Sequence, residues 1–134
     1  MRRVILEKRA SGFKIMQRVL LVGINPSSAV NGQNTTWRRL PKWADYLGLG
    51  MFSFTNCIYN PGKYSMRDVD LDLLRESCRH HAKVVALGNF PSQALRKINV
   101  DHFTLPHPSG LNRKLNDREY ELDQLLKCRN YIHG

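Results

Sequence analysis

The sequence is short of acidic residues. Among its 134 residues, 11 are Asp or Glu and 21 are Lys or Arg, so the formal net charge is +10 with every histidine neutral. A small domain with this imbalance repels copies of itself and attracts polyanions. The composition therefore predicts a monomer whose partner is a nucleic acid.

Long apolar runs are also absent. No stretch of about 18 apolar residues is present, and a helix that crosses a bilayer needs roughly that length. Charged residues interrupt the apolar ones in residues 1–9, which leaves no recognisable secretory signal there. Hydrophobic residues make up 42% of the chain, which is typical of a folded domain. We therefore expect a single domain over residues 1–134 that is soluble, cytoplasmic and without a membrane partner.

Paired cysteines are the third absence. Cys57, Cys78 and Cys128 are widely separated, and no C-x-x-C pair or nearby histidine gives them metal-ligand spacing. An odd number of isolated cysteines fits neither a disulfide framework nor a zinc cluster. Such thiols are typical of a reducing compartment, where they stay buried or idle. We expect no metal site and no cofactor.

The remaining apolar pattern alternates between strand-like and helix-like segments. Strand-like runs cover residues 4–9, 13–16, 18–23, 51–56, 83–88 and 101–105. Helical periodicity covers residues 35–47, 66–81, 91–98 and 117–131, and Pro41 marks either a start or a kink of the first helix. The first two runs predict a short β-hairpin. The alternation that follows predicts a three-layer α/β/α domain around a central four-stranded parallel sheet.

Polar residues, glycine and proline follow the carboxyl end of each strand in this predicted sheet. The segments are residues 23–28, Asn56, residues 88–89 and residues 106–113. The carboxyl ends of parallel strands meet at one edge, where α/β proteins place their ligand crevice. We therefore expect the functional site at this edge. The histidines outside these segments are predicted to be solvated surface residues: His80, His81, His102 and His133.

Two of these segments resemble the active-site motifs of the uracil-DNA glycosylase superfamily. Residues 23–27 read G-I-N-P-S and are similar to the first motif of the mismatch-specific and single-strand-selective members, G-[IM]-N-P-G. Residues 107–111 read H-P-S-G-L and are similar to the second motif, H-P-S-P-L or N-P-S-G-L. Asn56 ends a strand as a base-reading asparagine of the family does, and residues 86–88 with Ala94 resemble a helix start of the family. The likeness spans roughly residues 18–113.

The resemblance implies a DNA glycosylase that flips a nucleotide out of DNA and hydrolyses the N-glycosidic bond of uracil or a related modified pyrimidine. Such an enzyme needs a positioned water and a donor to the oxygen of the departing base. The implied catalytic residues are Asn25, which orients the water, and His107, which donates to the base as neutral imidazole. Leu111 takes the wedge position that fills the gap in the base stack. An ordinary turn at Asn25 and an ordinary core leucine at Leu111 are the alternatives.

The base-binding residues implied are Ile24, Asn56 and Trp37. The Asn56 amide matches the 4-oxygen and the 3-nitrogen of uracil, or else it ends the strand by bonding the following loop. The stacking phenylalanine of the family has no counterpart, because residues 27–51 contain no Phe. Trp37 is the expected replacement, although its helical spacing with Trp43 equally indicates core packing.

The DNA contacts follow from the same resemblance and from the basic residues near the motifs. They are Ser27, Ser109, Gly110, Leu111, Arg113 and Lys114, with Arg38, Arg39, Lys42 and Arg118 as further phosphate contacts. A second resemblance is to small bacterial and phage proteins with N-P-S-x-A and T-x-x-R segments, here residues 25–29 and 36–39. Two alternatives remain open. One is an enzyme for a hypermodified base in phage or bacterial DNA, and the other is a catalytically inactive member of the superfamily that binds nucleic acid or protein.

Overall fold

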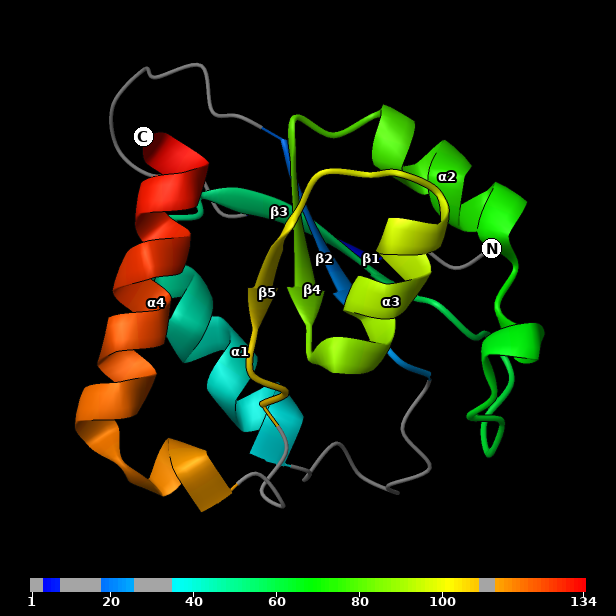
Figure 1. Ribbon diagram of the computed structural model, residues 1–134. Helices are drawn as coiled ribbons and strands as arrows, with labels where there is room; N and C mark the ends of the chain where they lie inside the picture. Colours follow the sequence, from blue (N-terminus) through cyan, green and yellow to red (C-terminus); the bar gives the residue numbers. More distant parts are fainter. Residues whose placement is uncertain (1–3, 8–17, 26–34, 109–112) are drawn as a thin grey trace.

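The computed structural model describes residues 4–7, 18–25, 35–108 and 113–134, which form a five-stranded sheet covered by helices (Figure 1). The strands are β1 Val4–Glu7, β2 Val19–Gly23, β3 Met51–Asn56, β4 Lys83–Leu87 and β5 Phe103–Leu105. Their order across the sheet is β1-β3-β2-β4-β5. The last four strands in this order are parallel, and β1 is antiparallel to β3. The predicted four-stranded parallel sheet is confirmed, with β1 added at one edge.

Helices cover both faces of this sheet in the described part of the chain. They are α1 Thr35–Tyr46, α2 Leu71–Arg79, α3 Asn89–Lys97 and α4 Arg118–His133. In Figure 1, α1 and α4 lie on one side of the sheet, and α2 and α3 lie on the other. The predicted three-layer α/β/α architecture is therefore confirmed. None of the described helices combines the length and the apolar character that crossing a bilayer requires.

The central strand β2 shows why an uninterrupted apolar run predicts a covered strand. All of its residues are buried. Val19 and Leu21 belong to the cluster on the α1 and α4 side, whereas Leu20 and Val22 belong to the cluster on the α2 and α3 side. Because successive side chains point to opposite faces, both sets must be apolar when helices cover both faces.

Two expected segments differ locally from the structure. The helix predicted over residues 66–81 is split into a short 3₁₀ helix, η2 (Met66–Asp68), and α2. Ser65 caps η2, and the Asp70 side chain accepts from the Leu73 N–H at 3.0 Å to begin α2. Two capping side chains so close together start two helices rather than one. The second segment is the helix expected over residues 35–47: α1 begins at Thr35 and runs through Pro41, so Pro41 does not mark its start.

The predicted N-terminal hairpin is described only in its first arm. β1 confirms a strand within residues 4–9 and ends at Glu7. It pairs with β3, with Val4 opposite Phe54. The second predicted arm, residues 13–16, lies outside the described residues.

The cysteines are buried and unbridged. Burial raises the pKa of Cys57 and of Cys128 to about 12, and that of Cys78 to about 11. A thiol with so high a pKa stays protonated at neutral pH and is a poor nucleophile. The prediction that these thiols are buried is confirmed.

Candidate functional site

The carboxyl ends of the parallel strands meet at one edge of the sheet. The register places Gly23 at the end of β2 opposite Asn56 at the end of β3. In Figure 1, β4 and β5 point to the lower edge, where α1 begins and where the 3₁₀ helix η3 (Arg113–Asn116) precedes α4. This edge, here named the carboxyl rim, carries Asn25, Asn56 and His107.

Asn25 lies directly after β2, and the loop that follows β3 holds its side chain. Its Nδ2 donates to the Lys63 carbonyl oxygen at 2.8 Å, although the two residues are 38 positions apart. A carbonyl oxygen only accepts, so the amide nitrogen of Asn25 must be the atom that faces Lys63. Among the described residues, no donor contacts the Asn25 Oδ1. In the described part of the chain, the nitrogen is thus the engaged end of the amide, and the oxygen is the end that could accept from a water or ligand.

The main chain strengthens this attachment between the two loops. The Ile58 N–H donates to the Ile24 carbonyl at 2.9 Å, and the Cys57 N–H donates to the Gly23 carbonyl at 2.9 Å. The parallel ladder of β2 and β3 thus continues past the ends of both strands. Ile24 itself is half-buried. The position of Asn25 is consequently set by its backbone as well as by its side chain.

Asn56 ends β3, and its side chain lies over Gly23 of the neighbouring strand. A β-carbon at position 23 would lie 2.7 Å from Asn56 Oδ1. Glycine is therefore required for the amide to occupy this place. Asn56 is half-buried, and its side chain makes no hydrogen bond to the described residues, including the loop that follows. Within the described part of the chain, its donor and acceptor are therefore not taken up by another side chain or by the main chain.

Phe54 brings an aromatic ring to the same point. The β-carbon that position 23 lacks would lie 2.9 Å from Phe54 Cζ, so this ring packs on the backbone of Gly23. Sequence reasoning missed Phe54 because it sought a phenylalanine only in residues 27–51. The period of two along a strand provides the missing signal, since Phe54 and Asn56 must point to the same face.

His107 follows β5 and packs against Gly88 at the end of β4. Gly88 has a φ of +104°, and a β-carbon there would lie 3.2 Å from His107 Cβ. The Gly88 N–H donates to the Leu105 carbonyl at 2.8 Å, which joins the two strand ends. Burial lowers the pKa of His107 below its ordinary value of 6.5. The imidazole is therefore neutral at pH 7 and carries one N–H donor.

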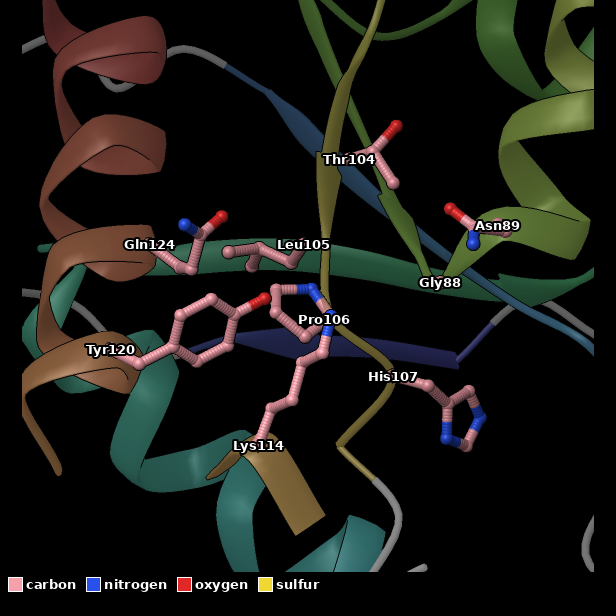
Figure 2. Close-up of a pocket in the computed structure, with 9 residues that line it drawn as sticks. All are labelled: Gly88, Asn89, Thr104, Leu105, Pro106, His107, Lys114, Tyr120 and Gln124. Atoms are coloured by element: carbon pink, nitrogen blue, oxygen red, sulfur yellow. The ribbon is translucent and has the colours of Figure 1, made fainter. Parts of the chain in front are cut away.

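A pocket of about 410 Å³ opens beside His107 at the outer end of the carboxyl rim. Polar groups from several elements line it: Asn89, Thr104, His107, Lys114, Tyr120 and Gln124. In Figure 2, the Lys114 amine and the Tyr120 hydroxyl both point toward Pro106, and the His107 ring lies on the other side of the chain. No carboxylate is among the described residues that line the pocket, whereas Lys114 supplies a cation. The surroundings suit an anionic or polar ligand. Neither Asn25 nor Asn56 reaches it.

Behind the rim lies a buried carboxylate that the sequence did not reveal. Glu121 of α4 accepts from Trp43 Nε1 at 3.2 Å. Its oxygens also lie 3.7 Å from Arg39 Nε and 3.5 Å from Arg118 Nη1. Arg39 Nη1 donates to the Pro108 carbonyl at 3.3 Å. Arg39 thus has internal partners where a phosphate contact was predicted, while the Arg118 side chain stays 80% exposed.

Two histidines predicted to be solvated are instead partly buried and bonded at both ring nitrogens. His81 bridges the Ser77 carbonyl at 2.7 Å and Ser53 Oγ at 2.8 Å. His102 bridges the Val100 carbonyl and Ser92 Oγ, each at 2.8 Å. A neutral imidazole has one donor and one acceptor, so it satisfies a carbonyl and a hydroxyl at once.

The other two histidines lie nearer to solvent. His80 is exposed and pairs with Glu76, in agreement with the prediction. His133 is exposed as a residue, but its Nε2 bonds the Leu47 carbonyl at 2.6 Å.

Several predicted site residues fall outside the part of the chain that the structure describes. They are Ser27, Ser109, Gly110 and Leu111. Trp37 belongs to α1 and Arg113 to η3, but their side chains are likewise outside it. Lys114 is exposed and lines the pocket.

Comparisons with known proteins leave the site to be interpreted from its own geometry. No protein-family model, no curated protein and no solved structure matches the chain.

Proposed function

We propose that this protein is a DNA glycosylase that hydrolyses the N-glycosidic bond of uracil or a related modified pyrimidine. The observation that carries the proposal is the placement of Asn25, Asn56 and His107 along the same carboxyl rim, each fixed by a different contact. Lys63 holds Asn25, Gly23 makes room for Asn56, and Gly88 packs against His107. These are the residues for which the motif resemblance implies roles in chemistry and base reading.

Asn25 has the role of orienting the attacking water. The water must approach the sugar carbon while the bond to the base breaks, and the sugar then gains positive charge. The Asn25 Oδ1 accepts a hydrogen from that water, because its nitrogen is engaged by Lys63. An amide is a far weaker base than a carboxylate, so its contribution is placement of the water rather than removal of a proton.

His107 has the role of donor to the departing base. The base leaves as an anion, with charge on the oxygen beside the broken bond. A neutral imidazole donates its N–H to that oxygen without first needing a charged ring to be desolvated. Burial supports this assignment, since it keeps the pKa of His107 low and the ring neutral at pH 7.

The charge of the carboxyl rim supports a nucleic-acid substrate. Arg38 near the start of α1, Lys114 of η3 and Arg118 of α4 are exposed and lie on the elements that meet at this edge. Contacts of such residues with phosphates contribute affinity without reading sequence. Because this basic surface does not depend on Asn25 or His107, binding without cleavage is the second candidate function.

The test uses single-stranded and double-stranded oligonucleotides that carry uracil or one of several modified pyrimidines. We expect the protein to leave alkali-labile abasic sites at uracil, with or without a chelator. Cleavage only at another modified base would assign the enzyme to that base. If the protein binds DNA in a salt-dependent way but cleaves nothing at high protein excess, the second candidate function, nucleic-acid binding without cleavage, is favoured instead.

A further inference from the structure

We infer that Arg39 is a positioning residue: it holds the segment of His107 in place through the Pro108 carbonyl, while Glu121 orients its guanidinium. Arg39 ends the T-x-x-R segment, residues 36–39, for which the proposed function provides no role. The inference rests on the proposed function only for what His107 does, and the contacts stand by themselves.

The segment of residues 106–108 has few main-chain donors with which to form hydrogen bonds. Pro106 and Pro108 have no N–H, so His107 carries the only main-chain donor of the three. Its carbonyls must therefore supply much of the hydrogen bonding that holds it. The Pro108 carbonyl accepts from Arg39 Nη1 at 3.3 Å. Proline also restricts the backbone of the residue before it. A fixed Pro108 thus limits where His107 can lie.

Glu121 fixes the other side of the guanidinium. Arg39 Nε lies 3.7 Å from Glu121 Oε2, and Trp43 Nε1 donates to the same oxygen at 3.2 Å. The Glu121 side chain is 11% exposed, and that of Arg39 is 21% exposed. A shielded, planar guanidinium with two directional partners is held more tightly than a solvated surface charge. Arg39 therefore links α4 and α1 to the chain beside His107.

Arg118 provides a matched control. Its Nη1 lies 3.5 Å from Glu121 Oε1, so it shares the carboxylate with Arg39. Its side chain is 80% exposed. No hydrogen bond joins it to Pro108 among the described residues. Replacing Arg118 removes a positive charge from the same network but leaves the contact with the Pro108 carbonyl intact.

The experiment measures the Pro108 carbonyl ¹³C shift and the titration of the His107 ring by NMR. The variants are Arg39→Lys, Arg39→Met and Arg118→Met, each checked first by a thermal melt. Lys114 lines the same pocket as His107 and is unchanged in every variant. Arg39→Lys keeps the positive charge but lacks the fork that contacts two partners. It therefore separates position from charge.

We expect both Arg39 variants to move the Pro108 shift and to raise the pKa of His107 by about half a pH unit or more, because a looser segment is better solvated. Arg118→Met should change neither. A wild-type Pro108 shift and His107 titration in Arg39→Lys would overturn the inference. If Arg39→Met does not fold, the comparison of Arg39→Lys with Arg118→Met decides whether Arg39 holds the His107 segment.

A kinetic measurement then connects the positioning to the proposed reaction. On a uracil oligonucleotide, Arg39→Lys should lower kcat by about tenfold with little change in KM, as expected when only transition-state alignment is lost. An unchanged kcat would contradict a positioning role in catalysis. If the wild-type protein cleaves nothing, the proposed function fails, and the NMR measurements still decide whether Arg39 holds the segment.

Discussion

Gly88 and His107 lie in direct contact across the ends of β4 and β5. A β-carbon at position 88 would lie 3.2 Å from His107 Cβ, and Gly88 has a φ of +104°. A side chain at position 88 would therefore be strained by the backbone conformation and would crowd its neighbour His107. The place of His107 depends on a glycine distant in sequence.

Gly88→Ala tests this contact, and Gly62→Ala is its control. Gly62 also has a positive φ, +79°, but no atom lies within 4 Å of its missing β-carbon. A backbone conformation with positive φ costs an alanine about 1–3 kcal/mol, so both variants should lose stability in urea denaturation. Gly88→Ala should lose more and should also shift the His107 ring resonances. Equal losses of stability in the two variants, with unshifted His107 ring resonances, would show that the contact between Gly88 and His107 is unimportant.

The partial burial of His107 predicts that the stability of the protein depends on pH. Its pKa is lowered in the folded protein, so the folded state binds fewer protons than the unfolded state near the ordinary value of 6.5. The stabilisation is complete above 6.5 and is lost as the pH falls through the folded pKa. Melting temperatures measured from pH 7.5 down to about pH 5 should fall less steeply in His107→Gln than in the wild type. Parallel curves would contradict the burial of His107.

Alanine at Asn25 or at His107 should separate catalysis from binding. In the proposed function both groups would act mainly on the transition state, so single-turnover cleavage of a uracil oligonucleotide should fall by about two to four orders of magnitude. DNA affinity should change little. Asn60→Ala is the control, because Asn60 is exposed in the same loop as Lys63. Wild-type cleavage by the folded Asn25 and His107 variants would refute their assignment.

Asn56→Asp tests which base is read. In the proposed function, the Asn56 amide would donate to the 4-oxygen of uracil and accept from the N–H at its 3-position, whereas cytosine presents the opposite pattern. An aspartate lacks the donor, and it accepts from the amino group of cytosine. We expect a large loss on uracil and a small gain on cytosine, measured with matched oligonucleotides. Undiminished cleavage of uracil would remove Asn56 from base reading.

Lys114→Gln tests the basic carboxyl rim. Each phosphate contact releases a counterion when DNA binds. The loss of one contact should therefore reduce the slope of log affinity against log salt concentration by about 0.9. Lys97→Gln is the control, because Lys97 is exposed at the opposite end of α3 from the rim. Lys97→Gln should keep the wild-type slope. An equal effect of both variants would indicate diffuse attraction rather than a site.

The sequence by itself determined the layers and the edge of the sheet at which Asn25, Asn56 and His107 lie. The apolar run of β2 could only belong to a strand covered on both faces, and the helical spacing of Leu40, Trp43 and Leu47 required a helix with one buried side. These patterns are local, because the apolar positions within each helix or strand show which of its faces is buried. Alternating strands and helices then left a parallel sheet as the natural arrangement, with Asn25, Asn56 and His107 at its carboxyl rim.

Only the tertiary structure decided which distant residues hold those side chains. Asn25 meets the Lys63 carbonyl, and Arg39 meets both Glu121 and the Pro108 carbonyl. A main-chain carbonyl is present at every residue, so nothing in the sequence marks the one that will be used. Glu121 likewise resembles any other acid of an exposed helix until α1 packs on α4 and removes it from water. Such partners are fixed by the packing of residues that are far apart in the sequence, so a local sequence pattern does not predict them.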